Sequence, residues 1–313
     1  MRFTPNSLLA GLVFSGFGLL VAADTDATVS TTAAAIPANV TAAVIDLLDA
    51  NHILHFLDVV DAFGHVSVRN PVNSSQFFMS YAIAPALTTS QHIVTYAINN
   101  ATAVALTFNS SVVGAKVPTG FAERYIHSEI YKKFPTVMAV VHSHTQEILP
   151  FANQATVPFV SQIHTSPAVG DVGVPIFDTR TLSANVLATS ALHDLLVRTE
   201  AVGDALAAKF VTGSSVVLMR GHGMAVHSTS IRDVVLNTFY VKQDATVQLQ
   251  GILLGGGRVA PLSLNSLEIA NASVTVHGSF VPRAWPLWVK QVDNNPVYEN
   301  DLRGKAAPAA TGF

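Results

Sequence analysis

The chain has 313 residues, a formal net charge of −3 and no cysteine, and half of its residues are hydrophobic. The lack of cysteine excludes disulfides, thiol nucleophiles, zinc fingers and iron–sulfur clusters, so any metal site must use histidine, carboxylate or carbonyl ligands. The small net charge, without a basic stripe, argues against nucleic acid as a partner, and the apolar content is too high for a disordered chain.

The N-terminus has the pattern of a secretory signal peptide. Arg2 precedes an apolar run from Leu8 to Leu20, and small residues follow up to Ala23, which predicts a signal peptide over residues 1–23. A membrane anchor is the alternative interpretation, but the run is short for a bilayer span. Residues 24–37 are rich in Thr, Ala and Ser and are expected to form a flexible leader.

Five Asn-x-Ser/Thr sequons agree with a secretory route. They predict N-glycosylation at Asn39, Asn73, Asn100, Asn109 and Asn271, although each triplet alone is a weak signal. Together with the signal peptide, they lead us to expect a protein that is secreted or resides in the lumen of the secretory pathway.

Helix and strand patterns then alternate along the chain. Apolar spacing and turn residues predict helices over 38–63, 121–134, 183–210 and 231–254, and strands over 65–69, 77–81, 92–97, 102–108, 137–141 and 215–219. The three glycines at 255–257 are expected to end the last helix. These elements favour one α/β or α+β domain over residues 38–260. The C-terminal extension, residues 261–313, is expected to be irregular.

Three histidines follow the two most apolar strands. His142 and His144 come directly after the strand at 137–141, and His222 follows the strand at 215–219 between two glycines. Residues two apart in extended backbone point to the same face, so the imidazoles of His142 and His144 can reach one ion. Three histidines with an open fourth position are typical of a catalytic zinc site. Ordinary structural histidines are the alternative at this point.

Glu123 and His127 lie four residues apart on one face of the helix predicted at 121–134. A carboxylate near a bound metal can act as a general acid or base. An acidic residue in the first turn also suits the helix dipole, with no catalytic role. The spacing leaves both interpretations open. His65, Arg69 and His164 are further candidates for contacts with a substrate, with a structural hydrogen bond as the alternative for each.

Three motifs resemble the class II aldolase and adducin family, which includes fuculose-phosphate aldolases and ribulose-phosphate epimerases. They are the segments 123–131 (ERYIHSEIY), 134–144 (FPTVMAVVHSH) and 218–223 (LMRGHG), and the similarity extends over roughly residues 40–255. The resemblance implies a three-layer α/β/α fold around a mainly antiparallel central sheet. It also implies a homo-oligomer, commonly a cyclic tetramer in this family.

The same resemblance assigns roles to the candidate residues. His142, His144 and His222 match the family's ligands for Zn²⁺, and Glu123 matches its acid/base glutamate. The ion would then bind neighbouring hydroxyl and carbonyl oxygens of a small-molecule substrate and stabilise an enediolate.

The sequence departs from the family where sugar-phosphate aldolases bind phosphate. Those enzymes have Gly-Asn, Thr-Gly and Ser-Ser pairs, whose hydroxyl and backbone N–H groups reach the phosphate. This chain has Gly64-His65, Ala84-Pro-Ala-Leu87 and Phe121-Ala122 at the matching places. We therefore expect an unphosphorylated hydroxy-carbonyl substrate. His65 stands in place of a phosphate-site asparagine and is expected to contact whichever group occupies that position.

Three functions remain open on the sequence. The first is a secreted zinc-dependent lyase of the aldolase, decarboxylase or dehydratase type. The second keeps the three histidines but binds Fe²⁺ and oxygenates a natural product, because histidine also binds iron. The third is a non-catalytic, adducin-like assembly domain, which the retention of all three histidines and Glu123 argues against.

Overall fold

The computed structural model describes residues 36–154, 156–257 and 261–303, which belong to one compact unit. The predicted signal peptide, residues 1–23, and most of the predicted leader lie outside the described residues. Among the described helices, none is long and apolar enough to cross a membrane.

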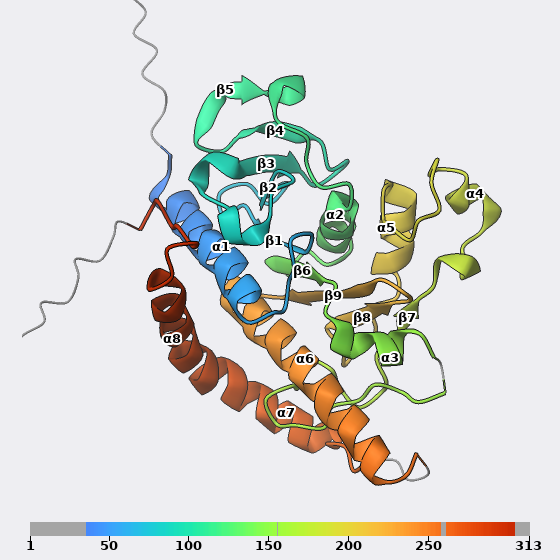
Figure 1. The fold of residues 1–313 in the computed structure, drawn as a ribbon. Helices are drawn as coiled ribbons and strands as arrows, with labels where there is room; N and C mark the ends of the chain where they lie inside the picture. The colour runs from blue at the N-terminus through green and yellow to red at the C-terminus, as the bar shows by residue number, and fades with distance from the viewer. Residues whose placement is uncertain (1–35, 155, 258–260, 304–313) are drawn as a thin grey trace, which may run out of the picture. The chain divides into compact units, whose positions relative to one another are not determined.

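Nine strands form one sheet at the centre of this unit (Figure 1). Their order is β5-β4-β3-β2-β1-β6-β9-β8-β7, and every neighbouring pair is antiparallel except β7 and β8. The expectation of a mainly antiparallel sheet is therefore confirmed. The strands are β1 (His65–Arg69), β2 (Gln76–Ser80), β3 (Ile93–Ala97), β4 (Ala103–Leu106), β5 (Asn109–Val113), β6 (Ala139–Ser143), β7 (Ile176–Phe177), β8 (Val216–Met219) and β9 (Gly223–Ser228).

Helices cover both faces of the sheet. One face packs against α1, α6 and α8, and the other against α2 and α5 (Figure 1). The helices are α1 (Ala38–Phe56), α2 (Arg124–Lys133), α3 (Leu149–Ala152), α4 (Ala184–Leu187), α5 (Glu200–Ala207), α6 (Ile231–Leu254), α7 (Ser266–Thr275) and α8 (Val281–Asp293). The three-layer α/β/α prediction is thus confirmed.

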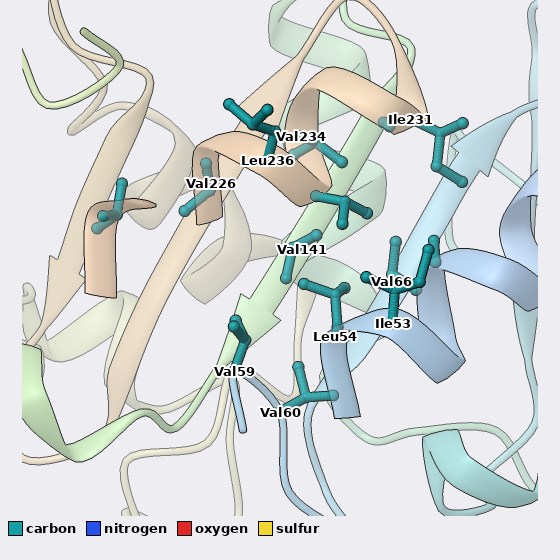
Figure 2. Packing of buried hydrophobic residues seen from close by; sticks show 14 of the residues in the cluster. Ile53, Leu54, Val59, Val60, Val66, Val141, Val226, Ile231, Val234 and Leu236 are labelled. Carbon is teal, nitrogen blue, oxygen red and sulfur yellow. The ribbon is translucent and has the colours of Figure 1, made fainter. Parts of the chain in front are cut away.

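The two-residue period of the strands divides the core into two clusters. In β6, Val141 packs in the cluster beneath α1 and α6, whereas Val140 packs in the cluster beneath α2 and α5. Figure 2 shows the first cluster, in which Val141 and Val226 of the sheet lie close to Leu54 of α1 and Val234 of α6. Because His142 follows Val141, the same alternation turns its side chain towards α2.

Helix α1 ends seven residues before the predicted boundary at residue 63. Its last turn closes when the N–H of Val59 donates to the carbonyl of Leu54 (2.9 Å) and the N–H of Asp58 donates to that of His55 (3.1 Å). Asp58 adopts a left-handed φ of 52°, the conformation that usually marks a helix C-terminus and usually requires glycine. The predicted boundary was wrong because Asp58, and not a glycine, occupies the left-handed position, so the sequence carries no glycine to mark the end of the helix.

The prediction of one long helix over 183–210 was wrong. Only α4 and α5 are helical there, and residues 188–199 between them are irregular, with Leu195 at a φ of 72°. The backbone N–H of Val197 donates to Glu123 instead of to a helical carbonyl (2.9 Å). A tertiary contact therefore overrides the helical spacing of this segment.

The expectation of an irregular tail was also wrong. α7 and α8, joined by a π-helical turn at Val276–Phe280, cover residues 266–293. Trp285, Trp288 and Val292 of α8 are buried in the same cluster as α1 and α6. Pro286 inside α8 obscures the pattern because proline normally disfavours a helix interior.

Candidate metal centre

Strand pairing brings the two histidine motifs together at one end of the sheet. β6 pairs with β9 so that Ser143 lies opposite Met224. His144 therefore leaves the end of β6 beside the short turn that contains His222, between β8 and β9. The turn is tight: Gly221 has a φ of 67°, and a Cβ on Gly223 would lie 2.1 Å from the carbonyl oxygen of Ser143. Both glycines are required, as their spacing around His222 suggested.

Four side chains converge there with the geometry of a metal site. Glu123, His142, His144 and His222 each offer one ligand atom, and these four atoms all lie within 4.8 Å of one another. Nε2 of His144 is 2.9 Å from Nε2 of His142 and 3.2 Å from that of His222. Oε2 of Glu123 is 3.3 Å from Nε2 of His142 and 3.4 Å from that of His222. Ligands about 2.0–2.1 Å from a tetrahedral zinc ion are about 3.3 Å apart, so the four atoms fit such an ion.

The hydrogen bonds behind the imidazoles support this interpretation. Nδ1 of His142 lies 3.0 Å from the carbonyl oxygen of Met224, and Nδ1 of His144 lies 3.3 Å from a carboxylate oxygen of Asp61. Both partners can only accept, so each Nδ1 carries the proton and each Nε2 presents a lone pair. Two lone pairs 2.9 Å apart repel unless a cation lies between them. Burial lowers the pKa of His144 to about 4, which keeps this ring neutral and able to bind a metal.

Glu123 is held as a carboxylate at the N-terminus of α2. Its Oε1 accepts the N–H of Val197 (2.9 Å), while Oε2 faces the histidines. Burial alone would raise the pKa of Glu123, whereas positive charge at the positions of the His142 and His222 rings holds it well below its usual range. With neutral imidazoles, a bound cation would supply that charge. An ionised oxygen beside the metal position suits either ligation or proton transfer. This position favours the functional interpretation of Glu123 over a role limited to the helix dipole.

Asp61 was not identified from the sequence. It accepts from His144 Nδ1 and from the backbone N–H groups of Phe63 and Gly64 (2.8 and 2.9 Å). A carboxylate that orients a metal-binding histidine is a common arrangement. Asp61 lies 83 residues from His144, so no local spacing could have revealed the pair.

The four ligand candidates lie against an apolar pocket of about 740 Å³. Three of them line it, and its other walls are mainly alanine, phenylalanine and aliphatic side chains. The lining residues are Ala62, Phe63, His65, Ala82, Ile83, Ala84, Phe121, Ala122, Glu123, His144, Leu196, Gly221 and His222. None of these described lining residues is a lysine or arginine, so the pocket offers no cationic side chain to a phosphate.

The three weaker substrate candidates have different positions. His65 lines the pocket, and its ring packs 4.6 Å from that of Phe121, centroid to centroid. Arg69 points away into the core, where it donates to the carbonyls of Val137 (2.9 Å) and Tyr131 (2.9 Å). His164 is exposed, with its ring against Phe280, and is not among the lining residues. Only His65 is thus placed to contact a substrate in this pocket.

Comparisons with known proteins agree with this fold. A family model described as class II aldolase and adducin N-terminal domain matches residues 45–249. The chain is 36% identical over 264 residues to the decarboxylase tropJ of Talaromyces stipitatus, an alignment that covers 80% of this chain and 93% of that protein.

Solved structures show the same fold at low sequence identity. An aldolase II superfamily protein from Pseudomonas syringae is similar with a TM-score of 0.62 and 16% identity, covering 84% of this chain and 96% of that one. An L-fuculose 1-phosphate aldolase from Glaciozyma antarctica is similar with a TM-score of 0.60 and 17% identity, covering 85% and 95%.

Proposed function

The chain belongs to the class II aldolase and adducin family, and on that premise we propose that it is a metal-dependent lyase of the decarboxylase type. Its substrate is an unphosphorylated hydroxy or oxo acid with a largely apolar body. The observation that carries this proposal is the convergence of Glu123 with three histidines at the end of an apolar pocket. The similarity to a fungal decarboxylase favours loss of CO₂ over the other lyase reactions.

The residues present fit a divalent ion, for which we propose zinc. His142, His144 and His222 would hold it through Nε2, with Oε2 of Glu123 at the fourth position only while no substrate oxygen occupies it. A bound ion supplies Lewis-acid polarisation of a substrate oxygen that gains negative charge. Asp61 and the carbonyl of Met224 keep the Nδ1 protons of His144 and His142 in place, so that both Nε2 atoms stay available.

Glu123 is the proposed proton carrier. In decarboxylation the bond between the carboxylate and its neighbouring carbon breaks, CO₂ leaves, and the electron pair remains on that carbon. Oε2 of Glu123 passes a proton from solvent to this carbon, so that one carboxylate and one proton give CO₂ and a C–H bond. The N–H of Val197 holds Oε1 and thereby fixes the direction in which Oε2 acts.

The pocket walls support the proposed substrate class. Phe63, Ile83, Phe121 and Leu196 offer apolar surface, which favours a substrate body of low polarity. Among the described lining residues, no lysine or arginine is present to pair with the second negative charge of a phosphate, and an unpaired buried charge is costly. The replacement of the family's phosphate-binding residues, expected from the sequence, agrees with the absence of lysine and arginine from the lining residues.

A direct assay separates this function from sugar-phosphate cleavage. Zinc-supplemented protein is incubated with 2-hydroxybenzoate, 3,4-dihydroxybenzoate, benzoylformate and L-fuculose 1-phosphate, and both CO₂ and aldehyde are measured. We expect CO₂ from at least one apolar acid and no cleavage of the phosphate ester. Glu123→Gln should lower turnover by about 10²–10⁴-fold. Cleavage of L-fuculose 1-phosphate, or no CO₂ from any acid, contradicts the proposal.

We also propose that the protein acts as a secreted homo-oligomer. Asn39, Asn73, Asn109 and Asn271 are exposed and Asn100 is half-buried, so glycosyl transfer to the exposed sequons meets no steric obstacle. A fall in mass after glycosidase treatment of the protein from culture medium tests secretion and glycosylation together. Light scattering tests the oligomeric state expected from the resemblance to the family.

A further inference from the structure

A chain of four buried polar side chains runs from the pocket wall into the core. Nδ1 of His65 lies 2.7 Å from Nε2 of His127, and Nδ1 of His127 lies 2.6 Å from Oγ of Ser67. Oγ of Ser67 lies 2.8 Å from the hydroxyl of Tyr131. All four residues are at most 2% exposed. His65 is the only one of the four among the pocket-lining residues.

The inner end of this chain fixes the direction of its hydrogen bonds. The Tyr131 hydroxyl has one proton, and Ser67 is its single hydrogen-bond partner among the described residues. If Tyr131 donates to Ser67, then Ser67 donates to Nδ1 of His127. Nε2 of His127 then carries its proton and donates to Nδ1 of His65. Both imidazoles are therefore protonated at Nε2.

The opposite direction leaves a donor unpaired in the core. His65 would donate to His127, His127 to Ser67 and Ser67 to Tyr131, so that the Tyr131 proton would have no acceptor. Leaving a buried donor unsatisfied costs about 1–3 kcal/mol. The first direction pairs every donor of Tyr131, Ser67 and His127. Its one unpaired donor is Nε2–H of His65, a buried atom without a hydrogen-bond partner among the described residues, which lies at the pocket wall where a ligand can accept from it.

We propose that His65 is the substrate-orienting donor of this site: its Nε2–H, held in that tautomer through His127, Ser67 and Tyr131, donates to a carboxylate oxygen of the substrate. The identity of the acceptor rests on the proposed function, whereas the tautomer does not. His65 lies opposite His142 in the pairing of β1 with β6. A substrate oxygen on His65 is therefore adjacent to the metal position.

The chemistry of a neutral donor suits an acid that loses CO₂. The hydrogen bonds along the chain leave His65 a single N–H, at Nε2, so a ring in this tautomer orients a carboxylate without neutralising it. A positive side chain would stabilise the charged acid more than the uncharged product. The single N–H instead fixes the carboxylate while the apolar walls surround it.

Histidine tautomers can be measured directly in the zinc-loaded protein. Two-dimensional NMR of ¹⁵N-histidine-labelled protein distinguishes an Nε2–H ring from an Nδ1–H ring, and His65→Gln and His127→Gln assign the signals. We expect the Nε2–H tautomer in both His65 and His127. An Nδ1–H tautomer in either ring overturns the proposal. Metal content is measured separately, so loss of zinc refutes the proposed function and leaves the tautomer result intact.

Binding of 2-hydroxybenzoate tests the donor role. In the wild-type protein we expect saturation with this probe to shift the His65 Nε2–H signal. His65→Met, which has no donor, should weaken binding about tenfold, the effect of losing one hydrogen bond to a charged group. His65→Gln retains an N–H donor and should stay within about threefold of the wild type. His164→Gln, on the exposed histidine, is the control and should bind normally.

The contrary results are equally definite. Three results would overturn the donor role. They are wild-type affinity for the probe in His65→Met, probe binding that leaves the His65 Nε2–H signal unmoved, and no detectable binding of the probe to the wild-type protein. Thermal unfolding of both His65 variants shows whether a loss of affinity comes from a loss of fold. The shift in the wild-type protein does not depend on His65→Met, so it decides the matter if that variant does not fold.

Discussion

Removal of the Asp61 charge is expected to weaken metal binding without removing a ligand. Asp61→Asn retains an oxygen for the N–H groups of Phe63 and Gly64, but it no longer places a negative charge beside Nδ1 of His144. Loss of such a partner commonly lowers metal affinity by about 10–100-fold. The contact between Asp61 and His144 is 3.3 Å long and the Asp61 side chain is 49% exposed. Solvent therefore weakens the interaction, and we expect the smaller loss of affinity in that range. We predict about tenfold weaker binding, or about 1.4 kcal/mol.

Competition with a chromogenic chelator at neutral pH measures this change. Asp58→Asn is the matched control, because it removes the same charge from an exposed position on the same loop. Asn readily adopts the left-handed backbone of residue 58. The prediction is wrong if Asp61→Asn binds zinc as tightly as the wild type, or if Asp58→Asn weakens binding equally.

Three further predictions concern stability and the shape of the site. Burial raises the pKa of Asp244 to about 7, above its unfolded value, so the stability of the fold falls as the pH rises from about 4 to 7. In urea denaturation, Asp244→Asn should therefore be more stable than the wild type by up to about 4 kcal/mol at pH 8 and by little at pH 4. Equal gains at the two pH values would refute this prediction. By the same method, Trp288→Ala should lower the free energy of unfolding by about 3–5 kcal/mol, because Trp288 is buried. Leu287→Ala, on the exposed face of α8, should lower it by less than about 1 kcal/mol. Equal losses would contradict the packing described for α8. Gly223→Ala should lower both the melting temperature and the zinc affinity, because the added Cβ meets the backbone of β6. Gly278→Ala is the control: its Cβ enters open space, so it should change neither quantity. Unchanged zinc affinity in Gly223→Ala would contradict the prediction.

Local patterns predicted the elements that rest on repeated apolar spacing. The residues 231–254 were predicted as a helix from their 3.6-residue period, and α6 has those bounds. The predicted strand at 137–141 corresponds to β6, which continues through His142 to Ser143. In both, the side chains that decide the structure are close in sequence, so the pattern is sufficient.

Elements that depend on distant contacts were predicted less well. The segment that follows α4 has helical spacing, but it is not a helix, and the N–H of Val197 donates to Glu123 and not to a helical carbonyl. Helix α8 was not predicted although Trp285, Trp288 and Val292 recur at helical spacing. Pro286 interrupts this pattern with a residue that normally disfavours a helix interior. The apolar spacing of α8 is therefore a local signal for the helix.

In the candidate site, too, local patterns were predicted from the sequence and distant contacts were not. His142 and His144 were predicted to share an ion because an extended backbone places residues two apart on one face. The approach of His222 depends on the pairing of β6 with β9. Its place after an apolar strand suggested that it joins the other two histidines, and the family resemblance assigned it as a ligand. The contact of Asp61 with His144 and the hydrogen bonds that link His65 to Tyr131 join residues that lie at least 60 apart in the sequence. Their roles required the fold.

Elemental analysis of the purified protein tests the metal centre most directly. The arrangement of Glu123, His142, His144 and His222 predicts one divalent ion per chain, which we expect to be zinc. It predicts that the double variant His144→Ala/His222→Ala, which keeps the more deeply buried His142, loses that ion while it remains folded. One equivalent of iron would retain the site and favour oxygen chemistry instead. A folded wild-type protein without bound metal, or a double variant that keeps a full equivalent, would contradict the account.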